Sequence, residues 1–303
     1  MPDQHVPRGS GPWPVNNELH TVRSWFAQRC CMDDGRESES VVRLVLDCVS
    51  GMSRMDRLTA PWRASESELE RLALLADRLK DGEPVQYALG ETSFAGLTFQ
   101  CDRRALIPRP ETEELLVEAL RRVQTMTGDA PLRVLDIGTG SGILPIAWKS
   151  HRPSDEVHGL DVQPDALELA AANAERLGCA VDFHCIDILE PQLEGGIFAA
   201  PFDVILSNPP YIPQTDRSEM LPNVLNWEPA SALFVEDDDP LLFYRRILDG
   251  CHHEDWLAAG GLLAFECHRD GTQEVVDLIP DDWSSKERMR DLQGNWRLVA
   301  ARR

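Results

Sequence analysis

The second half of the chain alternates short apolar runs with longer segments of helical period, and this alternation limits the possible folds more than any other feature. We expect strands at residues 132–138, 156–162, 181–187, 202–208, 261–267 and 295–301, and helices from about residue 142 and at 164–178, 240–253 and 272–279. Apolar strands that alternate with helices indicate an α/β fold with a doubly wound, mostly parallel sheet. The last strand could also run antiparallel, because Gly294 and the long linker before it leave its direction open.

The first part of the chain has a different period. Residues 39–49 and 65–80 carry apolar residues three and four positions apart, which predicts helices, and Ser65 with Glu68 fits a capping box. Residues 93–102 alternate around a central glycine, as expected of a short hairpin. We therefore expect a flexible tail at residues 1–16, a helical domain at 17–90, a hairpin and linker at 91–110, and the α/β domain at 111–303.

Charge and apolar content exclude several classes of protein. The formal net charge is −21, whereas a protein that binds nucleic acid directly usually presents a basic face. The acidic surface is consistent with simple solubility or with adaptation to a salty cytoplasm. No apolar run approaches the roughly 20 residues of a membrane helix, and no basic-then-apolar leader opens the chain. We expect a cytoplasmic protein with no membrane partner.

The eight cysteines include no C-x-x-C pair. Adjacent residues on a helix point to different faces, so the pair Cys30 and Cys31 makes a poor joint metal ligand. We expect reduced thiols and no metal site.

A glycine-rich turn, LDIGTGSG at residues 135–142, follows the first strand of the predicted sheet. In a doubly wound sheet the ligand lies outside the carboxyl ends of the strands. A dinucleotide fingerprint would need a glycine at position 143, which is isoleucine, so the spacing disfavours NAD and FAD. The predicted cofactor turn consists of Gly138, Thr139, Gly140, Ser141 and Gly142.

The next two strands end in carboxylates. Asp161 lies 23 residues after Gly138 (161 − 138) and can accept both hydroxyls of a ribose, although a purely turn-forming role is an alternative. Asp187 suits an adenine amino group, and Ile188 can pack against the ring. Such a site holds an adenosine without a phosphate cradle, which predicts S-adenosylmethionine as the cofactor.

The fourth strand runs into the segment SNPPYIP, residues 207–213. The carboxamide of Asn208 and the carbonyl of Pro209 can accept two hydrogen bonds from a planar NH2 group, and two prolines in a row stiffen the loop. Tyr211 can lie flat against that group. Holding a weakly nucleophilic amide nitrogen in line can contribute about 7–11 kcal/mol. We predict Asn208, Pro209 and Tyr211 as catalytic residues, with Asn208 also beside the cofactor; an ordinary Asn-Pro turn is the alternative.

These motifs together resemble a class I S-adenosylmethionine-dependent methyltransferase that acts on planar nitrogen. The segments GEPVQYALGETSFAGLTF, LIPRPETEELL, NWEPASALF and FYRRIL are more specific. They resemble the release factor glutamine methyltransferases, the PrmC/HemK family, over about residues 80–303.

The resemblance implies a seven-stranded sheet and methylation of the glutamine side-chain amide in the Gly-Gly-Gln loop of peptide-chain release factors, with S-adenosylhomocysteine as the product. It places the substrate loop on Asn208, Pro209, Pro210, Tyr211 and Ile212. This chain departs from the family pattern at Cys267-His268 and in the acidic run from Glu236 to Asp239, which leaves substrate docking on that side open.

Enzymes that act on two other kinds of substrate share parts of this sequence pattern. A related enzyme modifies a glutamine of a large-subunit ribosomal protein, and DNA or RNA adenine-N6 methyltransferases share the NPPY motif but should carry a basic groove. A binding module without activity is a further alternative, which the intact Gly138 turn, Asp161 and Asn208 disfavour. A side-chain amide alone offers little surface for selecting one protein, so we expect residues 17–90 to dock the protein substrate.

Overall fold

A computed structural model of the protein describes residues 11–31, 35–190, 193 and 195–303. These residues form two compact units. The helical unit contains the described residues up to Gly90 together with Pro222–Trp227, and the sheet unit contains Glu91–Leu221 and Glu228–Arg303. Residues 1–10 of the predicted tail lie outside the described residues, and the predicted domain boundaries remain predictions.

The helical unit contains α1 (Leu19–Arg29), α2 (Arg36–Ser50), α3 (Arg54–Thr59), α4 (Glu66–Lys80), α5 (Val85–Leu89) and α9 (Pro222–Trp227). Its core is built from one apolar face of each longer helix and includes Val22, Phe26, Val45 and Leu72, all fully buried. The predicted helices at 39–49 and 65–80 are confirmed as α2 and α4. The capping box is also present: Ser65 Oγ accepts from the N–H of Glu68, whose side chain accepts from the N–H of Ser65.

The sheet unit contains β1 (Glu91–Phe94), β2 (Leu97–Gln100), α6 (Pro110–Thr127), β3 (Arg133–Ile137), α7 (Ile143–His151), β4 (Glu156–Asp161), α8 (Pro164–Leu177), β5 (Asp182–Cys185), η1 (Gly196–Ala199), β6 (Phe202–Ser207), β7 (Ile212–Pro213), η2 (Gln214–Glu219), η3 (Ala230–Ala232), β8 (Phe234–Val235), α10 (Leu242–His253), β9 (Leu257–Glu266), α11 (Thr272–Leu278), β10 (Ser285–Arg290) and β11 (Trp296–Arg302). β1 and β2 form the predicted hairpin, and β7 pairs with β8 in parallel.

Across the described residues, the main sheet has seven strands in the order β10-β11-β9-β6-β3-β4-β5. The pairs β3–β4, β3–β6, β4–β5 and β6–β9 are parallel, and β11 runs antiparallel to both of its neighbours. The prediction of a doubly wound, mostly parallel sheet is confirmed, and the last strand takes the antiparallel direction that the sequence left open.

The edge strand β10 was missed and falls in a segment expected to be a linker. Its sequence, SKERMR, has one large apolar residue among charged ones, so it carries no strand-like apolar run. Charged side chains are common on edge strands because they discourage pairing with another sheet.

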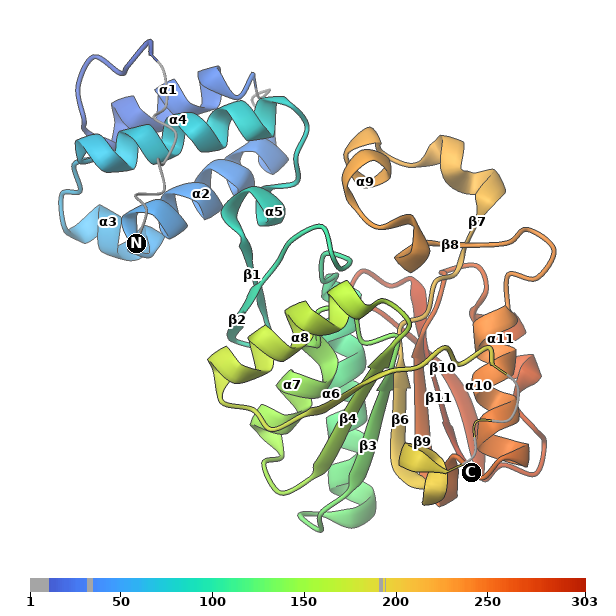
Figure 1. The fold of residues 1–303 in the computed structure, drawn as a ribbon. Coiled ribbons are helices and arrows are strands. Elements are labelled where there is room, and N and C mark those ends of the chain that lie inside the picture. The colour runs from blue at the N-terminus through green and yellow to red at the C-terminus, as the bar shows by residue number, and fades with distance from the viewer. Residues whose placement is uncertain (1–10, 32–34, 191–192, 194) are drawn as a thin grey trace. The chain divides into compact units, whose positions relative to one another are not determined.

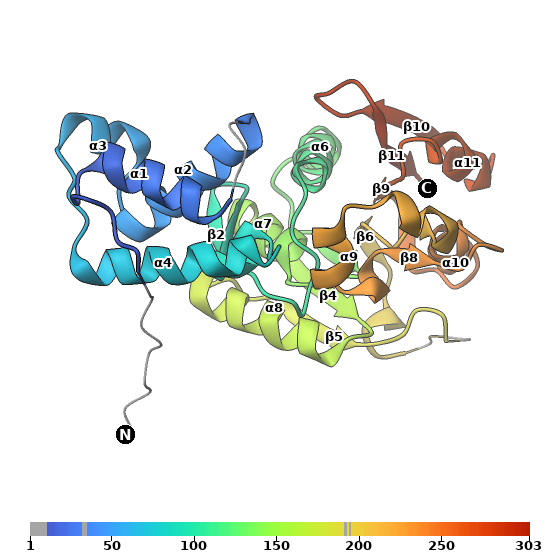
Figure 2. The same ribbon diagram turned by 90° about the horizontal axis from the view of Figure 1, so that it is seen from above.

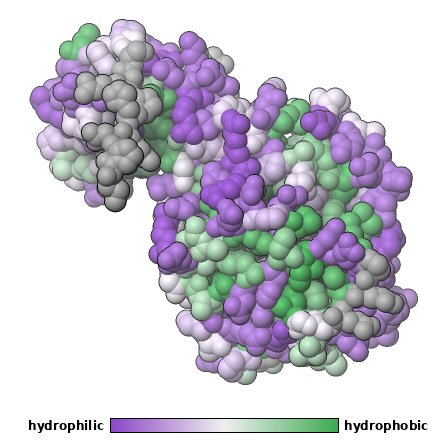
Figure 3. All heavy atoms as spheres, viewed as in Figure 1, coloured by the Kyte–Doolittle hydropathy of each residue, from purple (hydrophilic) through white to green (hydrophobic). Residues whose placement is uncertain are grey.

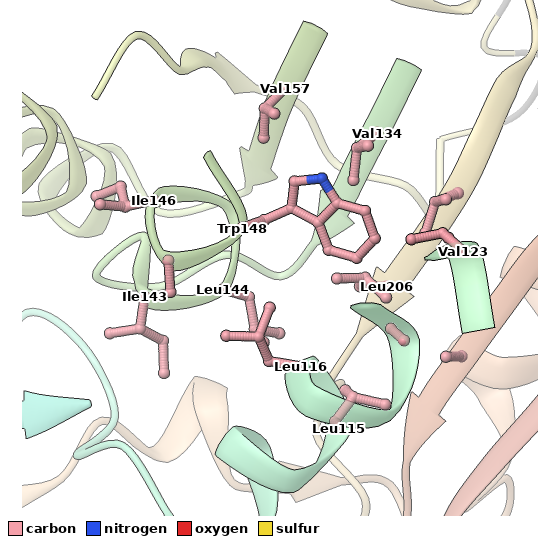
Figure 4. Close-up of a cluster of buried hydrophobic side chains, with 14 of the residues drawn as sticks. Leu115, Leu116, Val123, Val134, Ile143, Leu144, Ile146, Trp148, Val157 and Leu206 are labelled. Carbon is pink, nitrogen blue, oxygen red and sulfur yellow. The ribbon is translucent and has the colours of Figure 1, made fainter. Parts of the chain in front are cut away.

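Helices cover both faces of the sheet (Figure 1). α6, α7 and α8 pack on one face, where the buried Trp148 lies among Val134, Val157 and Leu206 (Figure 4). α10 and α11 pack on the other face around Phe265. Adjacent residues of β6 enter different cores because successive side chains of a strand point to opposite faces. α8 lies along β4 and β5 in both ribbon views (Figures 1 and 2).

The surface in view is largely hydrophilic, in keeping with the acidic composition, and hydrophobic residues gather over the middle of the sheet unit (Figure 3). The exposed large apolar side chains of the sheet unit include Val162 and Leu189. None of the helices within the described ranges is both long and apolar enough to span a bilayer.

Candidate active site

A cavity lies at the carboxyl ends of β3, β4 and β6 in the sheet unit. It is the place where the topology brings the predicted site residues together, since parallel strands end at one edge of the sheet. Of the predicted residues, the cavity is lined by Gly138, Thr139, Gly140, Ser141, Asp161, Asp187, Ile188, Asn208, Pro209 and Pro210. Gly142, Tyr211 and Ile212 are not among its lining residues.

The glycine turn uses its three glycines in different ways. All have a positive φ, at 76° for Gly138, 52° for Gly140 and 79° for Gly142, which favours glycine. A Cβ on Gly142 would lie 2.9 Å from Cδ1 of Ile146 and 3.0 Å from Cβ of Ala170, so Gly142 allows α7 and α8 to pack closely. A Cβ on Gly138 would meet nothing within 4 Å. Gly138 and Gly140 therefore expose backbone to the cavity, whereas Gly142 serves packing.

Asp161 holds the turn and also lines the cavity. One carboxylate oxygen accepts from the N–H of Gly140 at 2.9 Å, and the other accepts from the N–H of Gln163 at 2.9 Å. These contacts are those of a turn-forming aspartate, and each oxygen retains a lone pair for a ligand hydroxyl. Burial raises the pKa of Asp161, against the opposing effect of the backbone hydrogen bonds.

Asp136, the aspartate of LDIG, lines the cavity and was not among the predicted site residues. It is 1% exposed, and its Oδ1 has no hydrogen-bond partner among the described residues. Burial raises the pKa of Asp136 to about 7; the nearby Thr139 hydroxyl opposes this rise, and the Asp161 carboxylate adds to it. A buried carboxylate oxygen facing a cavity suits a ligand that brings a positive charge. An acid inside an otherwise apolar strand was the available signal.

A side chain of α10 holds the segment that follows β5. Arg246 donates from Nε to the carbonyl of Ile188 at 2.7 Å, and Asp187 Oδ1 accepts from the N–H of Leu189 at 2.9 Å. Ile188 is buried and lines the cavity. These two contacts hold the predicted adenine-side pair in place.

The loop after β6 presents two acceptors. Ser207 is fully buried and donates from Oγ to the carbonyl of Ile137 at 2.8 Å, which ties the end of β6 to β3. Asn208 donates from Nδ2 to Thr112 Oγ1 at 3.3 Å. Within the described part of the chain, neither Asn208 Oδ1 nor the Pro209 carbonyl receives a hydrogen bond. Both oxygens are available to a planar NH2 group.

Tyr211 points to a different partner than the sequence suggested. Its hydroxyl donates to Glu266 Oε1 at 3.3 Å, and burial raises the pKa of the phenol. The next residue, Ile212, donates its backbone N–H to the carbonyl of Leu233 at 3.0 Å. The loop is therefore held at its far end, and substrate contacts of Tyr211 and Ile212 remain predictions.

Comparison with known proteins identifies the family. The model described as Methyltransferase small domain matches residues 112–230, and the model described as PrmC N-terminal domain matches residues 22–90. The release factor glutamine methyltransferase of Flavobacterium psychrophilum is 35% identical over 284 residues, which cover 93% of this chain and 98% of the relative. The enzyme of the same name from Bacteroides thetaiotaomicron is 38% identical over 239 residues, 78% of this chain and 81% of the relative.

The chain belongs to the release factor glutamine methyltransferase family. The resemblance predicted from the motifs is confirmed, as is the assignment as a methyltransferase. A solved structure of the hMettl16 catalytic domain has a TM-score of 0.50 and 17% identity, and the match covers 77% of this chain and 81% of that one. At this identity the likeness supports the fold alone.

Two further features of this family member were missed from the sequence. Thr112, in the first turn of α6, donates from Oγ1 to Glu266 Oε2 at 2.6 Å. Arg109 lines the cavity and forms an ion pair with the buried Glu228. Both contacts join segments more than 100 residues apart, at 154 and 119 positions, which local patterns do not reveal.

Proposed function

We propose that this family member transfers a methyl group from S-adenosylmethionine to the side-chain amide nitrogen of the glutamine in the Gly-Gly-Gln loop of peptide-chain release factors. Its relatives, which are named release factor glutamine methyltransferases, support this substrate. The observation that carries the proposal is that Asn208 and Pro209 line the same cavity as the glycine turn and Asp161, and that the carbonyl oxygens of their side chain and backbone, respectively, receive no hydrogen bond within the described residues.

The residues of the cavity fit the cofactor. Asp161 would hold the ribose hydroxyls, Asp187 and Ile188 the adenine, and the unpartnered Asp136 oxygen the positively charged amino-acid part. The backbone of Gly138 and Gly140 allows close approach. When bound, S-adenosylmethionine supplies a methyl group on a positively charged sulfur.

The protein's main contribution is to orient a weak nucleophile. The nitrogen lone pair of an amide is delocalised, so its position relative to the methyl group matters more than its basicity. Asn208 Oδ1 and the Pro209 carbonyl would accept the two N–H groups of the glutamine and direct the nitrogen at the methyl carbon. On transfer, the bond between the methyl carbon and the sulfur would break, leaving S-adenosylhomocysteine, and the methylated nitrogen would release one proton to solvent, because an N–H becomes acidic once the new bond forms.

The helical unit is proposed to dock the protein substrate. Its surface carries exposed apolar side chains, including Leu44 and Met55, at 42% and 68% exposure. A specific protein contact typically buries on the order of 1,200–2,000 Å² in total, far more than a glutamine side chain offers. Since release factors act in translation, we propose a cytoplasmic site of action and no direct contact with nucleic acid.

The decisive assay is transfer of a tritiated methyl group to purified release factor. We expect labelling of the wild-type release factor and none of a variant whose loop glutamine is replaced by alanine. Parallel reactions contain a large-subunit ribosomal protein, and DNA or RNA with target adenines. Preferred labelling of either alternative substrate would overturn the proposed function.

A further inference from the structure

A buried network of side chains lies behind Asn208. Asn208 Nδ2 lies 3.3 Å from Thr112 Oγ1, which lies 2.6 Å from Glu266 Oε2. The other oxygen of Glu266 accepts from the hydroxyl of Tyr211 at 3.3 Å. Thr112 is 3% exposed and Glu266 is 1% exposed, so water does not compete for the hydrogen bond between them. Neither Thr112 nor Glu266 was predicted as a site residue.

The direction of each hydrogen bond follows from the number of protons available. A threonine hydroxyl has one proton, and the 2.6 Å distance is typical of an O–H donated to a carboxylate. With its proton committed to Glu266, the Thr112 oxygen can only accept. Asn208 must therefore present its NH2 group to Thr112, which leaves its carbonyl oxygen, Oδ1, without a contact to the network.

Glu266 also binds the other end of the loop. Asn208 reaches it through Thr112, and Tyr211 reaches it directly, so one carboxylate accepts donors from both ends of the Asn-Pro-Pro-Tyr segment. An ionised carboxylate accepts on both oxygens, whereas a carboxamide of the same shape accepts on one oxygen and donates on the other side. The arrangement therefore requires an acid at this position rather than any polar side chain of that size.

We infer that Thr112 and Glu266 are positioning residues for methyl transfer, because they fix the Asn208 carboxamide with its oxygen toward the substrate nitrogen. This inference rests on the proposed role of Asn208 as an acceptor. The opposite orientation would place NH2 against the N–H groups of the substrate, where donor faces donor. The network thus selects the productive one of two carboxamide orientations that differ little in shape.

The protonation state of Glu266 determines which groups of the network donate hydrogen bonds and which accept them. Burial raises the pKa of Glu266 to about 7, with Glu111 raising it further and Arg297 and the hydroxyls of Thr112 and Tyr211 lowering it. The titratable or charged groups around it are Glu111 from α6, Tyr211 from the loop, Tyr244 from α10, Cys267 from the end of β9 and Arg297 from β11. A protonated Glu266 can donate to Thr112, whose own proton then turns toward Asn208 and favours rotation of the carboxamide. The rotated carboxamide presents Oδ1 to Thr112 and its NH2 group to the substrate N–H groups. Loss of activity toward low pH follows.

The first test compares Thr112→Val with Thr112→Ser in steady-state reactions at saturating S-adenosylmethionine. Valine keeps the shape of threonine without the hydroxyl, and serine keeps the hydroxyl. We expect about a 10-fold loss of kcat for Thr112→Val, with a KM for the release factor within about 2-fold, and recovery of at least about a third of the activity by Thr112→Ser. Wild-type turnover in the valine variant, or equal losses in both variants, would refute the inference.

The second test uses the enzyme without protein substrate, so it stays informative if the proposed substrate is wrong. The carboxamide NH2 resonances of Asn208, assigned by their loss in Asn208→Asp, are followed by NMR. We expect them to shift and to exchange faster with water in Thr112→Val but not in Thr112→Ser. Unchanged resonances in both variants would show that Thr112 does not hold the carboxamide. Failure of methylation by the wild type, with these shifts intact, would count against the proposed substrate only.

The third test is the pH dependence of kcat. The wild type should lose activity below a pH of about 7, whereas Glu266→Gln should be slower throughout and lack this acid limb. Identical pH profiles for the two proteins would overturn the role of Glu266. Calorimetry of S-adenosylmethionine binding at each pH separates an effect on the cofactor from an effect on Asn208.

Discussion

The Arg109 guanidinium lies 2.6 Å from a carboxylate oxygen of Glu228, 119 positions further along the chain. The second oxygen of Glu228 accepts from the N–H of Ile107 at 3.2 Å. The Glu228 side chain is 1% exposed and that of Arg109 is 34% exposed. One buried glutamate therefore joins two motifs of the family, IPRP and NWEP, at the edge of the cavity.

Glu228→Ala should lower the free energy of unfolding by roughly 1–3 kcal/mol, because it leaves the buried N–H of Ile107 without an acceptor. The partial exposure of Arg109 keeps the loss at the lower end of what a fully buried pair would show. Urea unfolding measures the change. The control is Glu18→Ala, which removes a pair with Arg63 whose side chains are both more than half exposed and should cost about 0–1 kcal/mol. Equal losses in the two variants would contradict the structural role of Glu228.

Asp161→Ala should weaken binding of S-adenosylmethionine by about 1.5–3 kcal/mol, since it removes a charged acceptor for the ribose. It also removes the acceptor of the Gly140 and Gln163 N–H groups. Asp161→Asn is the matched control, because one carboxamide oxygen can still hold one of these N–H groups. Calorimetry should place the Asp161→Asn variant between the wild type and Asp161→Ala. Unchanged affinity for S-adenosylmethionine in both variants would mean that Asp161 only forms the turn and does not bind the ribose.

Local patterns in the sequence were sufficient for most of the sheet. The apolar run of β6 and the glycine turn before α7 each combine period and turn chemistry within a few residues. β10 carries neither signal, because its side chains are mainly charged and its position at the edge comes from pairing with β11. The contact between Thr112 and Glu266 could not be predicted for a related reason. It depends on the packing of α6 beside β9, which no local sequence pattern encodes.

Exposed apolar residues of the helical unit should contribute to recognition of the whole release factor. Leu44→Glu combined with Met55→Glu should raise the KM for intact release factor by about 5–10-fold, as expected for loss of a modest interface contact. The KM for a short peptide with the Gly-Gly-Gln sequence should not change. Leu292→Glu, at a 91% exposed position of the sheet unit, serves as the control. A parallel rise in KM for peptide and protein would contradict a docking role.

Two buried carboxyl groups should make the enzyme without cofactor less stable as pH rises. The pKa values of Asp136 and Glu266 are both raised to about 7 by burial, above the values of 3.8 and 4.5 for exposed groups. The folded state then binds more protons than the unfolded state between these limits, so the free energy of unfolding falls as pH rises from about 4 to 7. Urea titrations across this range should show a smaller slope for Asp136→Asn. The exposed substitution Asp165→Asn should leave the slope unchanged, and a slope equal to wild type in Asp136→Asn would contradict the assignment.

Asn208→Ala should nearly abolish methyl transfer while leaving cofactor affinity close to wild type, because the side chain is proposed to act on the substrate nitrogen. By analogy with the removal of one preorganised transition-state hydrogen bond, the loss should be roughly 10²–10³-fold in single-turnover rate. Asn208→Asp keeps an acceptor toward the substrate but loses the NH2 group that donates to Thr112, and its charge lies near Glu266. It should therefore retain only part of the activity, more than Asn208→Ala. Wild-type rates in both variants would mean that Asn208 merely shapes the turn after β6, and that the two acceptors of this loop do not hold the glutamine amide.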